Sequence, residues 1–109
     1  MKPLTREWLT KAERDFRVAR LLVRDWESGY GDAACFHCQQ AVEKYLKARL
    51  CESGRAIPYV HDLSTLLNLV TPIEPLWSSF TPACQTLTPY AVQTRYPGDD
   101  ASKADAQLA

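Results

Sequence analysis

The chain has 109 residues, of which 46% are hydrophobic and 24% are charged, with equal numbers of acidic and basic residues. This length supports one modest core, and the composition is typical of a globular protein rather than a disordered one. The zero net charge argues against non-specific coating of nucleic acids, but the charge is uneven. Residues 1–60 carry 11 Lys and Arg against 8 Asp and Glu, and residues 61–109 carry 2 against 5. We expect these halves to attract each other within the fold or across a dimer, and the imbalance also permits a local basic face.

The chain contains no apolar run long enough to span a bilayer, and its first six residues are too polar for a signal peptide. We therefore expect a cytoplasmic protein without membrane contact. In that compartment cysteines are normally free, and unpaired cysteines are usually buried. This is our expectation for Cys35, Cys38, Cys51 and Cys84.

Residues 6–28 are predicted to form the first long helix. At 100° per residue its apolar side chains gather on one face; they are Trp8, Leu9, Ala12, Phe16, Ala19, Leu22, Val23 and Trp26. Thr5 is a suitable N-cap, and Gly29 a suitable stop. Trp8 and Trp26 are separated by about 27 Å of helix rise, too far for both to fill the centre of one small core. We therefore expect at least one of these tryptophans at a dimer interface.

A second long helix is predicted from an Asp32 N-cap to about Ser53, with Gly54 as its stop. Its apolar stripe consists of Ala34, Cys38, Ala41, Val42, Tyr45 and Leu46. Two long helices joined by so short a turn should pack antiparallel.

A third, shorter helix is predicted to open at His61-Asp62 and to end before Pro72, with Leu63, Leu66, Leu67 and Val70 facing inward. Residues 75–95 are predicted to be helical but interrupted. Thr81 is the expected N-cap ahead of Pro82, and Pro89 should break the helix. The pattern from Ser102 to Asp105 resembles a capping box that opens a short final helix. The sequence thus predicts an all-α, up-and-down bundle of four to five helices in a single domain, residues 1–109, with a long antiparallel helix pair.

The segment from Cys35 to Cys38 suggests a zinc site, but His37 and Cys38 diverge by about 100° on a helix and cannot both face one ion. We therefore predict no metal site.

A possible anion site lies on the second helix, where four donors fall within a sector of roughly 80°: His37, Gln40, Lys44 and Lys47. Such a row of donors could hold a phosphate or a base, or it could be a solvated helix face or a dimer seam. The first helix carries a second basic strip of Arg17, Arg20 and Arg24, with Arg6 nearby, which suits an exposed charged face, a partner surface or an RNA backbone.

Three ordered stretches carry a resemblance to a known family. They are the segment from Phe36 to Ala48 (FHCQQAVEKYLKA), the His61-Asp62-Leu63 start, and the segment from Tyr90 to Asp99 (YAVQTRYPGD). In this order they resemble the HEPN superfamily of small α-helical domains, of the type that carries an Arg-Tyr-Pro-Gly-Asp turn. Domains of this kind usually end in a full-length helix, so the resemblance implies that the C-terminal helix is short or truncated here.

The resemblance implies a function linked to nucleotides or RNA. Ribonuclease members pair an Arg with a His four to six residues later on a helix, but no His follows Arg95 and Pro97 prevents that helix. We therefore expect a non-catalytic accessory domain without a cofactor. Its expected ligand is nucleotide-like or polyanionic, and its expected partners are a second copy and a minimal nucleotidyltransferase. The alternatives are an RNA-cleaving toxin of a toxin–antitoxin pair with an atypical active site, and a ligand-free dimeric interaction module. The candidate ligand-binding residues are His37, Gln40, Lys44, Lys47, Arg95, Tyr96 and Asp99; His61 is expected to cap the third helix.

Overall fold

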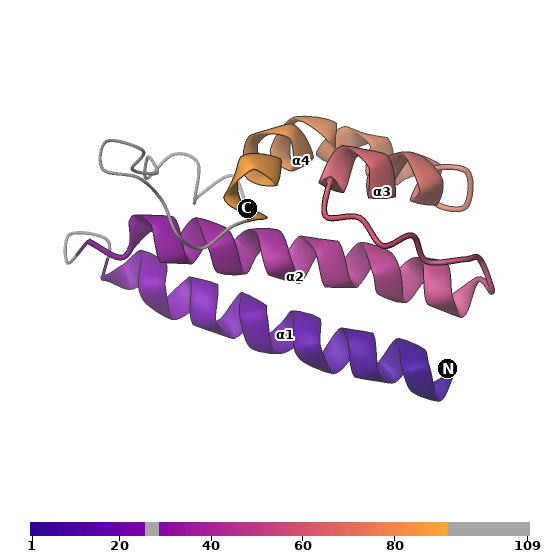
Figure 1. Ribbon diagram of the computed structural model, residues 1–109, viewed down its shortest axis with the longest axis horizontal. Coiled ribbons are helices and arrows are strands. Elements are labelled where there is room, and N and C mark those ends of the chain that lie inside the picture. The colour runs from indigo at the N-terminus through magenta and orange to yellow at the C-terminus, as the bar shows by residue number, and fades with distance from the viewer. Residues whose placement is uncertain (26–28, 92–109) are drawn as a thin grey trace.

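The computed structural model of the chain describes residues 1–25 and 29–91 (Figure 1). Within these ranges it contains four α-helices and two 3-10 helices, namely α1 (Pro3–Arg24), α2 (Gly31–Glu52), α3 (Leu63–Val70), η2 (Pro75–Phe80), α4 (Thr81–Leu87) and η3 (Thr88–Ala91). The long helices α1 and α2 run antiparallel, and α3 and α4 cover α2 on the side away from α1 (Figure 1). This confirms the predicted all-α fold with its long helix pair. No described helix is both long and apolar enough to cross a membrane.

Helix α1 begins earlier than the sequence pattern predicts. Pro3 occupies the first helical position, where its fixed φ and missing N–H cost nothing. The predicted Thr5 cap is therefore wrong, because Thr5 lies inside the helix and is buried. The helix ends at Arg24, so the predicted end near residue 28 is also late; Trp26 lies outside the described residues.

The side chains that α1 buries fully against α2 are small. The buried residues of α1 are Thr5, Ala12 and Ala19, which are seven residues apart. The same spacing recurs on α2 in the buried residues Ala34, Ala41 and Ala48. A seven-residue repeat keeps one seam of a helix facing its neighbour, and small side chains in that seam let the two helix axes approach closely.

Helix α2 is the central element and buries residues around most of its circumference. It starts at Gly31 with Tyr30 at the N-cap position, so the predicted Asp32 cap is wrong by two residues. Asp32 instead sits in the first turn, where a carboxylate still favours the positive end of the helix dipole. The predicted stop is confirmed: Gly54 has φ of 79° directly after the C-cap Ser53.

Helix α3 begins at Leu63 because Asp62 caps it: the Asp62 carboxylate accepts a hydrogen bond from the Ser64 backbone N–H at 3.0 Å. The four residues predicted to face inward are all buried, and they form the main core with residues of α2 and α4. From those two helices the core takes Cys38, Leu46, Leu50, Cys84 and Leu87.

The predicted interruption between residues 75 and 95 is confirmed as far as residue 91. Helix α4 ends at Leu87, and Thr88–Ala91 continues as a 3-10 helix around Pro89, whose ring cannot follow a continuous α-helix. The expected Thr81 cap is wrong, since Phe80 occupies that position and Thr81 is the first helical residue. Residues 92–109 lie outside the described ranges, and with them the predicted final helix from Ser102.

Candidate functional site

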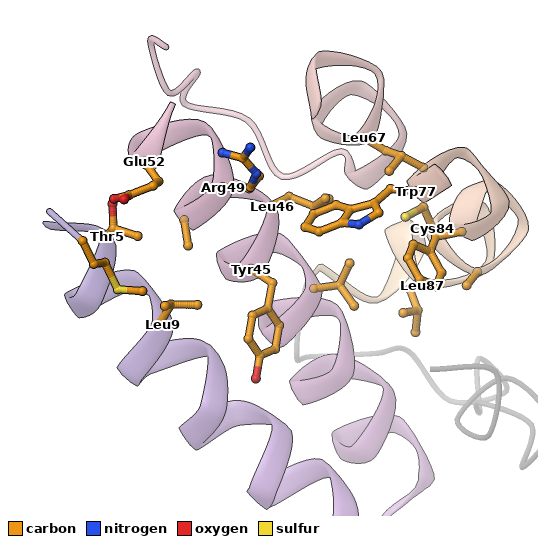
Figure 2. A pocket seen from close by; sticks show the side chains of 15 residues that line it. Thr5, Leu9, Tyr45, Leu46, Arg49, Glu52, Leu67, Trp77, Cys84 and Leu87 are labelled. Atoms are coloured by element: carbon orange, nitrogen blue, oxygen red, sulfur yellow. The ribbon is translucent and has the colours of Figure 1, made fainter. Parts of the chain in front are cut away.

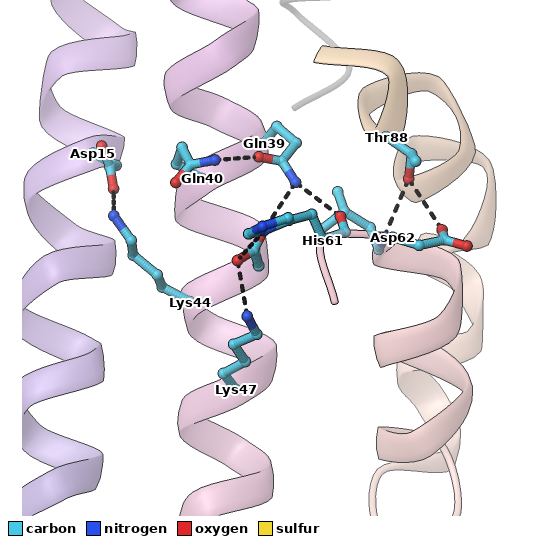
Figure 3. Close-up of polar contacts among 10 residues, drawn as sticks. Asp15, Gln39, Gln40, Lys44, Lys47, His61, Asp62 and Thr88 are labelled. Carbon is cyan, nitrogen blue, oxygen red and sulfur yellow. Dashed lines mark hydrogen bonds and ion pairs between the residues drawn. The ribbon is translucent and has the colours of Figure 1, made fainter. Parts of the chain in front are cut away.

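A buried polar cluster lies along one face of α2, where Gln39, Glu43 and Lys47 follow one another at intervals of four residues (Figure 3). Glu43 is 4% exposed and Lys47 is 5% exposed, and their side chains form an ion pair with an Nζ–Oε2 distance of 3.0 Å. The amide nitrogen of Gln39 donates to Oε1 of Glu43 at 3.1 Å. The aromatic ring of Trp8, from α1, lies 5.7 Å from the Lys47 Nζ and completes the enclosure.

His61 joins this cluster from the loop before α3. Its Nδ1 lies 3.0 and 3.1 Å from the two carboxylate oxygens of Glu43. Because a carboxylate only accepts hydrogen bonds, Nδ1 carries the proton and Nε2 is the acceptor in the neutral ring. The carbonyl of His61 also accepts from Gln39 at 3.1 Å. The His61 side chain is 61% exposed, so it is held from behind and open to solvent in front.

The charge of Glu43 is stabilised inside this enclosure. Burial alone would raise the pKa of Glu43, but hydrogen bonds from Lys47, Gln39 and His61, together with the Lys47 charge, lower it below its usual value. The carboxylate is therefore ionised at neutral pH, and its charge is balanced by one lysine. This arrangement orients an exposed imidazole with a fixed, charged carboxylate.

A second carboxylate organises the side of α2 that faces α1. Asp15 of α1 binds Nδ1 of His37 at 2.9 Å through one oxygen and Lys44 through the other. Gln40 donates from its amide nitrogen to the Gln39 side-chain oxygen at 2.7 Å. All these groups come from α1 and α2, and the two Asp15 contacts tie the long helix pair together.

The structure therefore brings the four α2 residues predicted for the site to one side of the helix, but each of them is already engaged. His37 and Lys44 contact Asp15, Gln40 contacts Gln39, and Lys47 contacts Glu43. Lys47 is also buried rather than exposed. The other predicted site residues, Arg95, Tyr96 and Asp99, lie outside the described residues.

Sequence reasoning missed Asp15, Gln39 and Glu43. The Gln39-Glu43-Lys47 spacing is a signal that could have been found, because side chains four residues apart meet on a helix. Asp15 had no comparable signal, since its partners lie more than twenty residues away. The prediction that His61 caps α3 is wrong, because Asp62 is the N-cap and the His61 side chain binds Glu43.

The outward face of α1 is the main exposed cationic surface in the described part of the chain. Its exposed charged residues are Arg6, Glu7, Lys11, Glu13, Arg14, Arg17, Arg20 and Arg24, which is six cations against two anions. Arg17 lies 3.9 Å from Glu13, where both side chains are exposed, and Arg20 lies over the Phe16 ring. A shallow depression of about 410 Å³ is lined by Arg6, Lys11 and Arg14 together with neighbouring residues.

The four cysteines are free and buried, which confirms the expectation from composition. Burial raises the pKa of Cys38 to about 11, and burial followed by the nearby Asp62 charge raises the pKa of Cys84. These two thiols therefore stay protonated at neutral pH. Among the described residues no three His, Cys, Asp or Glu side chains are grouped closely enough to hold a metal ion.

Comparison with known proteins connects this geometry to a family. Neither the curated proteins nor the solved structures contain a match to the chain. A family model described as the HEPN domain matches residues 5–109, which covers α1, α2 and the later helices. The protein belongs to the HEPN domain family.

Proposed function

We propose that this chain is a single, non-catalytic HEPN accessory domain, spanning residues 1–109, that binds a polyanionic or nucleotide-like ligand beside a minimal nucleotidyltransferase partner. The observation that carries the proposal is the contrast between two sets of cations. Lys44 and Lys47 of α2 are neutralised by carboxylates, whereas the cations along the outer face of α1 are exposed. In the described part of the chain, the cations that a polyanion can reach therefore lie mainly on α1 rather than on α2.

The geometry of α1 suits an extended anion. Arg6, Arg17 and Arg24 fall within roughly 20° around the helix axis, and they extend over about 27 Å of helix rise. Arginine binds phosphate through a planar, bidentate set of donors, which makes it well suited to an RNA backbone. A net excess of cations on one face also attracts a polyanion from a distance, although the chain as a whole is neutral.

This function is tested with a fluorescein-labelled single-stranded RNA of about twelve nucleotides, a length within the usual range of single-strand sites, in a fluorescence anisotropy titration. The double variant Arg17→Ala/Arg24→Ala should bind at least about tenfold more weakly than the unchanged chain. The slope of log affinity against log salt should become shallower by about 0.7 for each phosphate that the variant no longer neutralises. Arg55→Ala removes an exposed cation from a loop and is the matched control, with unchanged binding expected. Equal weakening in both variants, or no binding at low salt, would contradict the proposal.

A specific observation favours RNA cleavage as the second candidate function. The Glu43–His61 pair holds, through Nδ1, an imidazole whose side chain is largely exposed, and this is the arrangement expected of a general base. In this reading Nε2 of His61 takes the proton from a ribose 2′-hydroxyl, whose oxygen attacks the phosphorus and expels the 5′ oxygen, which water protonates. Incubation with RNA in EDTA should then give 2′,3′-cyclic phosphate ends that are absent with His61→Ala and present with His37→Ala. If the unchanged chain leaves RNA intact under these conditions, the non-catalytic proposal stands.

A further inference from the structure

A cavity of about 470 Å³ opens beside α2 (Figure 2). Its α2 residues include Val42, Tyr45 and Arg49, whose positions along the helix place them on a different face from the buried polar cluster. Three walls enclose the cavity. Helix α1 contributes Leu9, α2 contributes Val42 and Tyr45, and the η2–α4 segment contributes Trp77 and Ala83. Its floor is the main core itself, because Leu46, Leu67 and Leu87 line it and are buried.

The lining of this cavity is almost entirely hydrocarbon and aromatic. Three side chains in its lining can form hydrogen bonds: the Tyr45 hydroxyl, the Trp77 indole N–H and the Thr5 hydroxyl, which lies beside Glu52. The Tyr45 hydroxyl is also close enough to Glu13 and Arg17 of α1 for their charges to act on its pKa. Charged groups lie among its lining residues, where the Nε of Arg49 binds Glu74 at 2.9 Å and Glu52 accepts from the Lys2 backbone N–H at 3.0 Å. These charges are balanced in sign, so they do not select an anion or a cation.

The apolar lining of this cavity does not suit a nucleotide. A nucleobase buried here would leave most of its polar edge atoms without partners, and each such atom costs free energy when it is removed from water. A phosphate at Arg49 would lie near the Glu52 carboxylate and compete with Glu74 for the guanidinium. The volume, by contrast, lies within the range of cavities that hold small molecules, and those cavities are mostly apolar with a few polar groups that fix orientation.

We propose that this cavity binds a small, neutral, mostly aromatic molecule that carries one hydrogen-bonding group. The ring system would lie against Tyr45, Leu46 and Trp77, and its polar group would pair with the Tyr45 hydroxyl or the Trp77 N–H. Such a ligand would contact Leu9 of α1 and also Trp77 and Phe80 of η2. Phe80 is 54% exposed, and covering it would remove apolar surface from water. This site borders the cationic face of α1 at Arg17, which is near Tyr45, but its chemistry is different and the proposal does not rest on the proposed function.

The test uses 2-naphthol as the probe and isothermal titration calorimetry with the full chain. We expect saturable binding with one site per chain. Ala83→Phe and Val42→Phe, which fill the cavity from two different helices, should each weaken binding at least about tenfold while the helical circular dichroism is retained. Ala56→Phe makes the same change on an exposed loop residue outside the cavity and should leave binding unchanged. Two variants are used so that one misfolded protein does not decide the result.

Two further measurements separate this site from the polyanion face and from a protein interface. Adenosine 5′-monophosphate should not displace 2-naphthol, and Arg24→Ala, which leaves Arg17 beside Tyr45 in place, should bind 2-naphthol normally even if it binds RNA more weakly. The proposal is overturned if 2-naphthol fails to bind at millimolar concentration, or if neither filled variant weakens it. It is also overturned if sedimentation equilibrium shows a dimer that both filled variants dissociate, because the occupant is then a second copy of the chain.

Discussion

Replacing Lys47 with methionine removes the cation from a nearly buried ion pair and leaves the Glu43 carboxylate in the interior. Both side chains are only 6% exposed, and the atoms they pair are 3.0 Å apart. Breaking such a pair on one side costs about 3–5 kcal/mol of unfolding free energy, because the remaining charge is buried without compensation. His61 and Gln39 still donate to Glu43, so we expect a destabilisation of about 3 kcal/mol. That is a large part of the total stability of a domain of this size, about 5–15 kcal/mol.

The pH dependence of this destabilisation follows from the direction of the Glu43 pKa. In the unchanged chain that pKa is lowered, so the stabilisation is present above the ordinary carboxyl pKa and disappears as pH falls through the lowered value. In Lys47→Met burial without a cation raises the Glu43 pKa, so the variant recovers stability as protons bind. The difference between the two proteins should therefore be largest near pH 7 and shrink toward pH 4.

Urea denaturation followed by circular dichroism at 222 nm measures both effects. Lys11→Met removes an exposed lysine from α1 and should change the unfolding free energy by less than about 0.5 kcal/mol. Glu43→Gln combined with Lys47→Met should recover part of the stability, since no buried charge remains. A Lys47→Met effect below about 1 kcal/mol, or one that stays constant from pH 7 to pH 4, would refute a buried and ionised Glu43.

Three other predictions concern separate parts of the chain. Asp62→Ala should lower the unfolding free energy by about 1 kcal/mol because the α3 cap is removed, and Asp62→Asn should restore most of it in the same urea assay. Arg95→Ala should weaken binding of a nucleotide or polyanion roughly ten- to a hundredfold without a change in melting temperature, because charge-assisted phosphate contacts contribute about 1.5–3 kcal/mol; a lower melting temperature with unchanged affinity would mean a structural role. Sedimentation equilibrium at high micromolar concentration should find a homodimer with Trp8 or Trp26 at its interface, and a monomer would contradict this expectation.

The elements that sequence reasoning predicted well have strong local signals. Leu63, Leu66, Leu67 and Val70 repeat at helical spacing, and Gly54 permits the positive φ that ends α2. Pro89 breaks the last helical stretch for a steric reason that needs no tertiary information. The predicted helix starts were less accurate. Thr5 and Asp32 are residue types that often cap helices, but the helices begin two or three residues earlier, with Lys2 and Tyr30 at the N-cap positions.

The polar cluster is a different case, because its burial depends on what packs around α2. From sequence alone Gln39, Glu43 and Lys47 belong to a polar helix face, and exposure is the natural expectation for such residues. They are buried because α1 and the loop before α3 cover α2 from both sides, bringing Trp8 and His61 over them. An apolar stripe therefore underestimates the burial of a central helix, because such a helix is covered around most of its surface and residues outside the stripe are buried as well.

The seam of small side chains between α1 and α2 has a consequence for how the molecule opens. The buried side chains that α1 contributes are small, whereas α3 contributes three leucines and a valine. The larger apolar side chains of α1, such as Leu22 and Val23, are only partly buried. Separating α1 from α2 thus uncovers less fully buried hydrocarbon per turn than separating α3 does, and local opening follows the elements with the least buried apolar contact. Native-state hydrogen exchange should then show the α1 amides exchanging through a partial unfolding in which α2, α3 and α4 stay together. The arginine-bearing helix would then open before α3 does, once its Asp15 contacts to α2 are broken.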